Sequence, residues 1–409
     1  MAWKPLCPHI NRTQAFPDTQ TQFRKRFYMK EIIIGPDDGG KRLDRFMRKY
    51  LSKATLGSVY KIIRKDLKIN GHRGKNEYIL CEGDRLTLYL DDETLKSLTV
   101  SKEEKLRKNS VKKNFHVVYE DENILIADKP FGLLTHGDST EKKNHLANQV
   151  VDYLIASGEY KAGSSRTFVP APANRLDRNT TGLVLFGKNA AALRALNSMI
   201  RSGDVSKYYT TIVYGHVDQP LVLTGSLSKD ERTNKVTISD LSVDHLKEDK
   251  VVSSGDLRGH VNSDGSRDIE TIVVPVRKLK NSTLLEIQLV TGRTHQIRAH
   301  LASIGHPLAG DFKYQTREAS LFNRRLKTSA GISTQLLHSS RLQFHNCPEP
   351  LEYLEGRQFT APLPQTFTEA INILEKTTSG KSRGNSLNKK KSTRTQRNEK
   401  NNDKFRNSK

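Results

Sequence analysis

Cysteine and long apolar runs are scarce in this sequence, and both absences exclude whole classes of protein. The 409 residues include three cysteines, Cys7, Cys81 and Cys347, which are too scattered for a disulfide framework or a metal site. No stretch approaches the ~18–20 apolar residues that a membrane span needs. We therefore expect a protein of the reducing cytoplasm that has no membrane partner.

Acidic residues are also in deficit, because 45 Asp and Glu face 68 Lys and Arg and leave a formal net charge of +23. Residues 377–409 carry +9 of this charge and residues 1–28 carry +4. We expect a disordered basic leader at 1–28 and a disordered basic tail at 377–409, with a transit peptide as the alternative for the leader. The remaining +10 lies on the folded part and predicts a nucleic-acid partner.

Residues 29–98 have the pattern of a small α+β unit that binds RNA. Apolar spacing predicts helices at residues 41–51 and 55–65 and strands at 67–69, 77–80 and 85–90. The side chains expected to contact RNA crowd the junction between helix and strand: Arg42, Lys61, Arg64, Lys65, Lys68 and Asn70. The alternative for Arg42 and Asp44 is that they only cap and solvate a helix.

The same stretch resembles a known RNA-binding module. Arg42-Leu43-Asp44, the basic second helix and Lys68-Ile69-Asn70-Gly71 look like the S-four-like domain named after a small-subunit ribosomal protein. The resemblance implies that residues 29–98 bind RNA. Residues 91–114 are almost wholly polar and are interpreted as a linker without a core of its own. We place the end of this domain at 98 and the charged linker at 99–114.

From Phe115 onward the sequence alternates in the manner of strands, with helices between them. Strands are expected at residues 116–119, 123–128, 182–187, 207–217 and 284–290, and an alanine-rich helix at 190–202. Residues 252–268 are rich in small polar side chains and predict an exposed loop. This order favours an α+β domain with a mixed, mainly antiparallel sheet over a doubly wound fold, and we place it at 115–376.

A carboxylate flanked by cations lies in the first of three segments with chemical character. Asn174-Arg175-Leu176-Asp177-Arg178-Asn179-Thr180-Thr181-Gly182 runs directly into an apolar strand. The neighbouring arginines favour the ionised form of Asp177, which a nucleophile or a general base needs. They are also suited to holding phosphates on either side of a target nucleotide. The alternative is an ordinary ion pair within a loop.

The second segment, Lys207-Tyr208-Tyr209-Thr210-Thr211, offers a tyrosine. Alternation along a strand puts Tyr209 and Thr211 on one face and Tyr208 and Thr210 on the other. One tyrosine is then free to pack on a base or to carry a proton, whereas the other belongs to the packing of the sheet. The alternative is that both tyrosines are aromatic core.

The third segment runs from Thr291 to Leu301, with Gly-Arg-Thr-His-Gln-Ile-Arg-Ala-His within it. It ends in Gly305-His306-Pro307-Leu308 and Gly310-Asp311. It follows a strand and opens a helix, where free N–H groups favour an anion. His295 and Arg298 share one face of that helix, as do Gln296 and His300. Metal binding by the histidines is disfavoured, because no HExxH pattern occurs and the arginines would repel a cation.

In this order and at these separations, the three segments resemble the RluA-type pseudouridine synthases over residues 115–365. An S-four-like domain placed before them is typical of the subgroup that acts on large-subunit ribosomal RNA. The resemblance implies an isomerase that detaches a uridine in RNA from its ribose, rotates it and rejoins it through carbon 5. It implies neither a cofactor nor a metal, because the isomerisation gains and loses no atoms or electrons.

The resemblance also assigns roles to single residues. Asp177 matches the catalytic aspartate, acting as nucleophile or base, and Tyr209 matches the active-site tyrosine. Arg298 matches the basic residue that pairs with the aspartate, with Arg293 as the alternative. The residues expected to hold the RNA once the uridine has left its stack are Arg175, Arg178, Arg293, His295 and Gln296.

Three positions depart from the pattern of the family, and two other functions stand beside the first. Asn174, Asn179 and Thr181 occupy places where His, Asp and Ser are frequent, which bears on RNA contacts and not on the reaction. The alternatives are the same chemistry on transfer RNA and a non-catalytic RNA-binding or ribosome-assembly factor. No apolar stripe is left over for a second subunit, so we expect a monomer.

Overall fold

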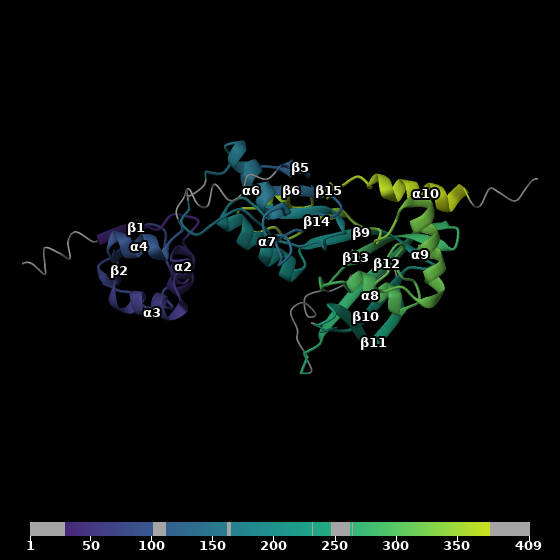
Figure 1. The fold of residues 1–409 in the computed structure, drawn as a ribbon, viewed down its shortest axis with the longest axis horizontal. Coiled ribbons are helices and arrows are strands. Elements are labelled where there is room, and N and C mark those ends of the chain that lie inside the picture. The colour runs from purple at the N-terminus through teal and green to yellow at the C-terminus, as the bar shows by residue number, and fades with distance from the viewer. Residues whose placement is uncertain are drawn as a thin grey trace, which may run out of the picture.

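A computed structural model describes residues 29–100, 112–161, 165–230, 232–246, 262–263 and 265–376. The predicted leader and tail, most of the linker and most of the predicted loop at 252–268 lie outside these residues. Figure 1 shows a small unit formed by the first part of the chain at one end of the molecule, beside a much larger sheet. Within the described ranges, no helix has the length and apolarity to cross a bilayer.

Residues 29–98 form a four-stranded sheet of order β1-β4-β2-β3 with helices packed on it. The elements are β1 Met29–Ile33, α2 Leu43–Tyr50, α3 Leu56–Lys65, β2 Leu67–Ile69, β3 His72–Arg73, β4 Arg85–Tyr89 and α4 Asp92–Leu98. The helices α2 and α3 form where apolar spacing predicted them, and Leu43, Phe46 and Ile63 lie in one buried core with the strands. Thr55 caps α3 by accepting the N–H of Ser58.

Two predictions for this unit are wrong. The expected strand at 77–80 is a loop with a single bridge between Ile79 and Arg42, because Tyr78 and Leu80 pair with the loop before α2 and not with a strand. The polar stretch that begins at Asp91 also contains a helix, α4. Asp91 caps it by accepting the N–H of Thr94, and Leu95 supplies the buried contact that anchors it.

The described residues from 112 onward form an 11-stranded sheet of order β11-β10-β12-β13-β9-β14-β8-β6-β5, with β15 on β14 and β7 on β8. The strands are β5 His116–Glu120, β6 Ile124–Lys129, β7 Ala171–Pro172, β8 Thr181–Gly187, β9 Val205–Tyr214, β10 Leu221–Asp230, β11 Lys235–His245, β12 Arg267–Leu279, β13 Ser282–Leu289, β14 Leu337–Phe344 and β15 Gln358–Thr360. Among the described strands, β14 and β8 are the one parallel pair, and the other pairs are antiparallel. The predicted α+β class with a mixed, mainly antiparallel sheet is confirmed.

Helices cover both faces of this sheet (Figure 1). They are α6 Leu146–Ala156, α7 Ala190–Ser202, α8 Gln296–Ser303, α9 Arg317–Ala330, α10 Gln365–Lys376 and the 3-10 turn η1 Glu352–Leu354. Leu125, Val184 and Ile287 pack with α6 and α8, whereas Ile126 and Leu185 on the opposite face pack with α7. Alternate residues of each strand thus serve two cores. The first of these cores supports the site described below.

The small unit contacts the large one through a buried carboxylate. Asp38 is 2% exposed and accepts hydrogen bonds from the hydroxyls of Ser165 and Thr167 and from the N–H of Arg166. Lys41 pairs with Asp38 at 2.8 Å and also donates to the Thr167 hydroxyl. Burial alone would raise the pKa of Asp38, but the bonds from Lys41 and Thr167 lower it below its ordinary value. The carboxylate is therefore an ionised link between the two units.

Candidate active site

The Asp177 loop lies between β7 and β8 and is clamped on both sides of the carboxylate. The hydroxyl of Thr135 donates to the carbonyl of Leu176 at 2.9 Å and accepts its N–H at 3.1 Å. The Leu176 side chain is buried in the main core, whereas the Arg175 side chain points outward. The Asp177 side chain, 33% exposed, is thus held by a fixed backbone and remains accessible from solvent.

A buried ammonium fixes the other side of the same loop. Lys129, at the end of β6, is fully buried, and its Nζ donates to the carbonyls of Pro130, Leu133 and Arg178 at 3.1, 2.8 and 3.0 Å. Burial lowers the pKa of Lys129 to about 7, against the opposing pull of the Asp177 and Asp128 carboxylates. Lys129 therefore places a titrating group directly beneath the Asp177 loop.

Two side chains of the third sequence segment, at the start of α8, face the Asp177 carboxylate. Nη1 of Arg298 lies 3.8 Å from Oδ2 of Asp177, and Nε2 of His295 lies 3.7 Å from the same oxygen. His295 is the residue before α8 and has a left-handed backbone, with φ 56°. A non-glycine residue in this region is uncommon and is found more often at functional sites. The structure therefore brings Asp177, His295 and Arg298 together as one group.

Arg298 is held rigidly behind Asp177 by a second carboxylate. Its Nε and Nη2 donate to Oδ2 and Oδ1 of Asp311 at 2.6 and 2.9 Å, and both side chains are almost fully buried. The Tyr314 ring covers the guanidinium, 5.0 Å from its central carbon. Although burial lowers the pKa of Arg298, the bonds to Asp311 raise it above its ordinary value. A permanent positive charge therefore faces Asp177.

His295 is neutral in this site. Burial lowers its pKa to about 4, and the cations of Arg298 and Lys313 oppose its protonation further, against the attraction of Asp177. Its Nδ1 lies 2.8 Å from the Tyr314 hydroxyl. The imidazole therefore faces Asp177 as a hydrogen-bonding group and not as a second cation.

Tyr209 lies on the inner face of β9, as the alternation predicted, and Tyr208 lies on the other face. The burial pattern of β9 alternates along residues 205–211, and Tyr209 is 5% exposed within the same core as Leu176 and Ile297. Burial raises the pKa of the Tyr209 phenol, and the nearby charge of Asp177 raises it further. Tyr208 instead stacks under the guanidinium of Arg341, at 3.5 Å. Tyr209 is thus the tyrosine near Asp177, and its phenol stays protonated at neutral pH.

Some of the residues predicted to hold RNA have exposed side chains, whereas others are already hydrogen-bonded within the protein. Arg175 and Arg178 are exposed beside Asp177, and Arg178 also reaches the Thr140 hydroxyl at 3.1 Å. Gln296 is 2% exposed, and its amide bonds to Thr291, Thr271 and the backbone of Glu270 and Arg293. Both polar atoms of that side chain are therefore used within the protein. In the structure, the Gln296 side chain stabilises the backbone at residues 291–293, whereas the sequence predicted that it contacts RNA.

Arg293 is placed differently from Arg298. Its Nε and Nη2 are buried, and neither has a hydrogen-bond partner among the described residues. Burial lowers the pKa of Arg293, and the nearby guanidinium of Arg267 lowers it further. Of the two arginines considered for the partner of Asp177, Arg298 is the one in contact with it. Arg293 instead presents unused donors, which suit an anionic ligand.

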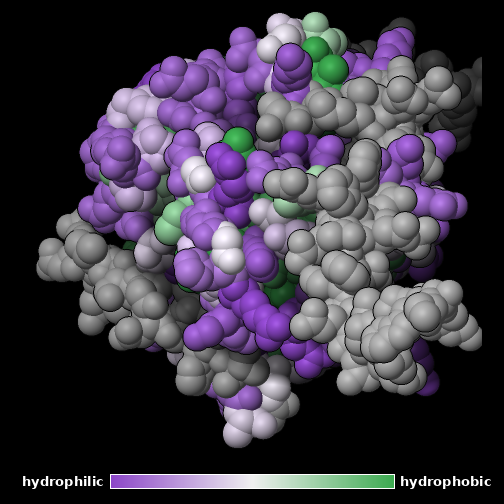
Figure 2. Space-filling model, turned by 90° about the vertical axis from the view of Figure 1, so that its left-hand side faces the viewer, coloured by the Kyte–Doolittle hydropathy of each residue, from purple (hydrophilic) through white to green (hydrophobic). Residues whose placement is uncertain are grey.

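The basic residues predicted in the small unit are largely exposed. Lys61, Arg64, Lys65 and Lys68 lie at the surface of α3 and β2. Figure 2 looks onto this end of the molecule and shows a predominantly hydrophilic face. Arg42 makes a two-point ion pair with Asp44 at 3.1 and 2.8 Å, and Asn70 bonds to Asp84 and to the N–H of Arg85 at the turn. These last two residues have structural partners in addition to any contact with RNA.

Two members of the site, Lys129 and Tyr314, were missed by the sequence reasoning, and Asp311 was included in the third segment without a role. Lys129 lies after the apolar run Ile124–Ala127 and Asp128, directly before a proline, and this position was a signal that a buried charge there needs partners. Asp311 ends the third segment and Tyr314 follows it, in a stretch with no periodicity. Their position depends on the return of the chain under α8, which no local pattern encodes.

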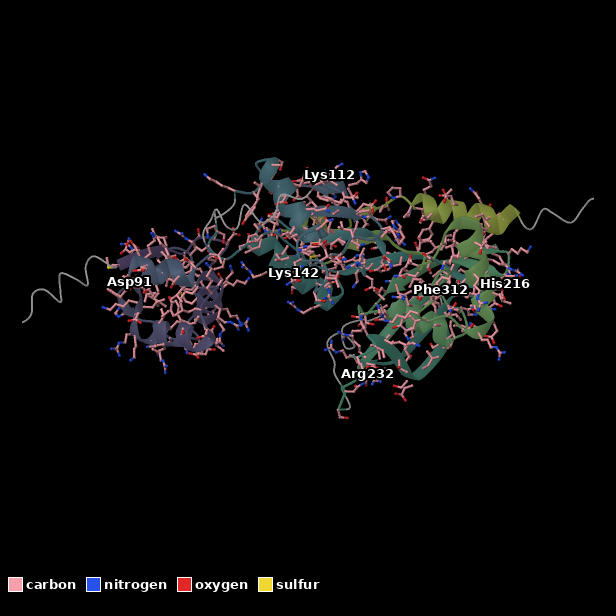
Figure 3. All side chains as sticks on the ribbon, viewed as in Figure 1. Asp91, Lys112, Lys142, His216, Arg232 and Phe312 are labelled. Carbon is pink, nitrogen blue, oxygen red and sulfur yellow. The ribbon has the colours of Figure 1, made fainter. Side chains whose placement is uncertain are left out.

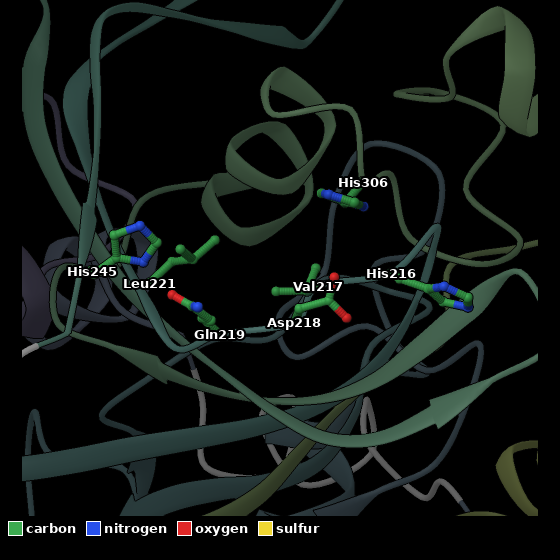
Figure 4. Close-up of a pocket in the computed structure, with 7 residues that line it drawn as sticks. All are labelled: His216, Val217, Asp218, Gln219, Leu221, His245 and His306. Carbon is green, nitrogen blue, oxygen red and sulfur yellow. The ribbon is translucent and has the colours of Figure 1, made fainter.

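The described residues include no group of three His, Cys, Asp or Glu side chains arranged to hold a metal ion. A pocket with several histidines lies elsewhere, around the connection between β9 and β10 (Figure 4). It is lined by His216, Val217, Asp218, Gln219, Leu221, His245 and His306. His306 contacts the carbonyl of Tyr214 and His216 contacts that of Leu279, so both rings have structural partners. The pocket contains none of the residues around Asp177.

Comparison with known proteins defines the class. The family model for RNA pseudouridylate synthase matches residues 123–303, which span the Asp177 loop, β9 and α8. Ribosomal large subunit pseudouridine synthase C of Vibrio cholerae is 31% identical over 80% of this chain and 89% of its own length. An uncharacterized RNA pseudouridine synthase of Bacillus subtilis is 28% identical over 85% of this chain and 98% of its own. A solved human structure, RNA Pseudouridylate Synthase Domain Containing 4, covers 63% of this chain and 92% of its own, with 21% identity and a TM-score of 0.46.

The protein is therefore an RNA-modifying isomerase. It belongs to the RNA pseudouridine synthase family, as its resemblance to the RluA-type members implied.

Proposed function

We propose that the protein converts uridines of large-subunit ribosomal RNA to pseudouridine. The observation that carries this proposal is the arrangement around Asp177, where one oxygen faces both Arg298 and His295 while the side chain stays accessible. The relatives from three Vibrio species and from Escherichia coli are named ribosomal large subunit pseudouridine synthases, which supports the same substrate here.

The reaction requires a carboxylate close to the nucleoside, where the bond between the ribose and the base breaks. Pseudouridine forms when the bond from ribose to N1 of uracil breaks, a bond to C5 forms, the C5 proton leaves and N1 gains one. We assign Asp177 as the group that acts on the nucleoside, as nucleophile or base, because its accessible carboxyl oxygen faces the fixed charge of Arg298 at 3.8 Å. The Tyr209 phenol stays protonated, so it serves as a stacking surface or a proton donor and not as a phenolate base.

Access to the buried face of a uridine requires the base to leave its stack. Arg175 and Arg178 are exposed on either side of Asp177 and are proposed to hold the phosphates of the displaced nucleotide. Arg293 has unused guanidinium donors for the same purpose. The basic residues of α3 and β2 are proposed to bind a neighbouring part of the RNA, as an S-four-like domain would. In this account the protein is a cytoplasmic monomer and its reaction requires neither a metal nor a cofactor.

The experiment is a comparison of RNA pools. Purified protein is incubated with a large-subunit ribosomal RNA transcript and, separately, with bulk transfer RNA that lacks modification, and pseudouridine is mapped in each. Modification of discrete sites in the ribosomal transcript supports the proposal. Modification of transfer RNA alone keeps the chemistry and overturns the substrate. No modification of either pool, with Asp177→Asn and wild type binding RNA equally, favours the non-catalytic binding factor.

A further inference from the structure

Tyr314 contacts both side chains that face Asp177. Its hydroxyl lies 2.8 Å from Nδ1 of His295, and its ring lies edge-on to the imidazole with the ring centres 5.5 Å apart. The same ring covers the guanidinium of Arg298. The Tyr314 side chain is 7% exposed, and its own N–H bonds to Asp311 at 3.2 Å. Tyr314 thus joins the two groups on one side of the carboxylate into a single packed unit.

The hydrogen bonds around the Tyr314 hydroxyl determine which nitrogen of His295 carries the proton. The hydroxyl oxygen accepts the N–H of Val236 at 3.0 Å, so its own hydrogen is available to donate. Nδ1 of His295 is the acceptor within reach in the described part of the chain. If Nδ1 carried a hydrogen instead, the hydroxyl oxygen would receive two donors and its own hydrogen would be left without an acceptor. The network therefore requires Nδ1 to be unprotonated.

We propose that Tyr314 is a positioning residue that fixes His295 as the Nε2–H tautomer, so that the imidazole aims an N–H at the Asp177 carboxylate. Nε2 lies 3.7 Å from Oδ2 of Asp177, close enough for a hydrogen bond to form as the side chains tighten around a substrate. The left-handed backbone of His295, φ 56°, directs the ring there, and the ring does not cap α8. The inference depends on the isomerase activity of the family and not on which RNA is the substrate.

The β10–β11 hairpin supports this arrangement from the far side. Val236 of β11 supplies the N–H that holds the Tyr314 hydroxyl, and Lys313 donates to the carbonyl of Asn234 at 2.6 Å. The Lys235 ammonium lies over the Tyr314 ring at 5.8 Å. Arg232, at the turn of this hairpin, marks its position in Figure 3. The hairpin that follows β9 along the chain therefore controls a proton position beside Asp177.

The first test needs no change at the site. Ring-nitrogen NMR shifts of His295 in protein with labelled histidine, assigned with the His295→Gln variant, report which nitrogen is protonated at pH 7. The inference expects a protonated Nε2 and an unprotonated Nδ1. The opposite tautomer, or an equal mixture of both, would overturn it. This measurement involves no RNA, so its failure is distinguishable from a failure of the proposed substrate.

The second test is a double-mutant cycle on single-turnover rates, with an RNA that the wild-type protein is shown to modify. Tyr314→Phe removes the hydroxyl and keeps the ring over Arg298, so the rate is expected to fall about tenfold while RNA affinity is unchanged. In the His295→Ala background the same substitution is expected to have no further effect. Additive losses in the two backgrounds would contradict the inference, because Tyr314 would then act without His295.

A matched control separates this role from a loss of packing. Tyr160 is also buried, and its hydroxyl donates to the carbonyl of Phe168 at 3.1 Å, away from Asp177. Tyr160→Phe should leave both the rate and its pH dependence unchanged. In Tyr314→Phe, by contrast, the acid limb of the rate profile should move to higher pH, because Nδ1 no longer receives a donor and accepts a proton more readily. A Tyr314→Phe profile that coincides with wild type would refute the proposal.

Discussion

Arg298 and Asp311 form a buried two-point ion pair, with Nε to Oδ2 at 2.6 Å and Nη2 to Oδ1 at 2.9 Å, and this leaves Nη1 of Arg298 facing Asp177. The arginine thus has one fixed partner and one functional partner. The Asp311 carboxylate offsets the desolvation of the guanidinium, so the charge opposite Asp177 is placed before any substrate arrives.

Lys129 is predicted to stabilise the Asp177 loop through its three carbonyl contacts. Lys129→Met should lower the free energy of unfolding by about 2–4 kcal/mol, because three buried carbonyls lose their donor. It should also reduce the modification rate, because the backbone at Arg178 is released. Urea unfolding and single-turnover rates measure the two effects. Lys142→Met, at an exposed lysine (Figure 3), is the control and should change neither.

Gly182 is predicted to be irreplaceable for a steric reason. Its φ is +105°, and a Cβ there would lie 2.2 Å from the carbonyl oxygen of Ser339 on β14. Gly182→Ala should therefore destabilise the protein by at least about 3 kcal/mol or prevent folding. Gly305 has φ +84° but open space around it, so Gly305→Ala should lose only about 1–2 kcal/mol. If Gly182→Ala and Gly305→Ala lose equal free energy of unfolding, measured by heat or urea, the contact with Ser339 is not the cause of the destabilisation.

Asp38 is predicted to hold the small unit, residues 29–98, against the large one. Asp38→Ala removes the acceptor for Ser165, Thr167 and Arg166, so the two units should separate more freely in solution. Small-angle scattering should show a larger radius of gyration for the variant, while single-turnover modification of a short RNA continues. Glu82→Ala removes one exposed carboxylate from the same unit and should scatter like wild type. Identical scattering from Asp38→Ala would contradict the role of the link.

Two buried histidines are predicted to make stability depend on pH. Burial lowers the pKa of His300 and of His338 to about 4, below the value of about 6.5 in an unfolded chain. The unfolded state therefore binds more protons between these values, and stability falls as pH decreases from 6.5 toward 4. Each histidine contributes up to about 1.4 kcal/mol per pH unit. His338→Gln should reduce the slope of unfolding free energy against pH, whereas His72→Gln, at an exposed strand, should not.

Much of the fold follows from local sequence pattern. The apolar face of α3, the alanine-rich α7 and the alternation in β9 predicted those elements closely, because each is determined by contacts within a few residues of the chain. The bounds of β13 were also close, and the third segment opens a helix, α8, as expected. The strand expected at 77–80 was wrong because its neighbours are set by the loop before α2, which is a tertiary contact.

The site was predictable in its motifs but not in its supports. Asp177, Tyr209 and Arg298 were singled out from sequence, and the structure brings Asp177 and Arg298 together from 121 residues apart. Lys129, Asp311 and Tyr314 act through partners that the sheet topology and the chain under α8 bring to them. Gln296 belongs to the third motif, but its side chain points into the protein. There its amide group forms hydrogen bonds with Thr291, Thr271 and two backbone groups. A motif therefore identifies chemistry, whereas burial decides which of its members reach the substrate.

We expect Asp177 to perform the isomerisation. The most direct measurement is pseudouridine formation under single-turnover conditions by wild type, Asp177→Asn and the control Asp218→Asn, at a surface ion pair with Lys278. The account predicts that wild type and Asp218→Asn form pseudouridine at equal rates, and that Asp177→Asn binds the same RNA but forms none. Pseudouridine formation by Asp177→Asn at the wild-type rate would contradict it.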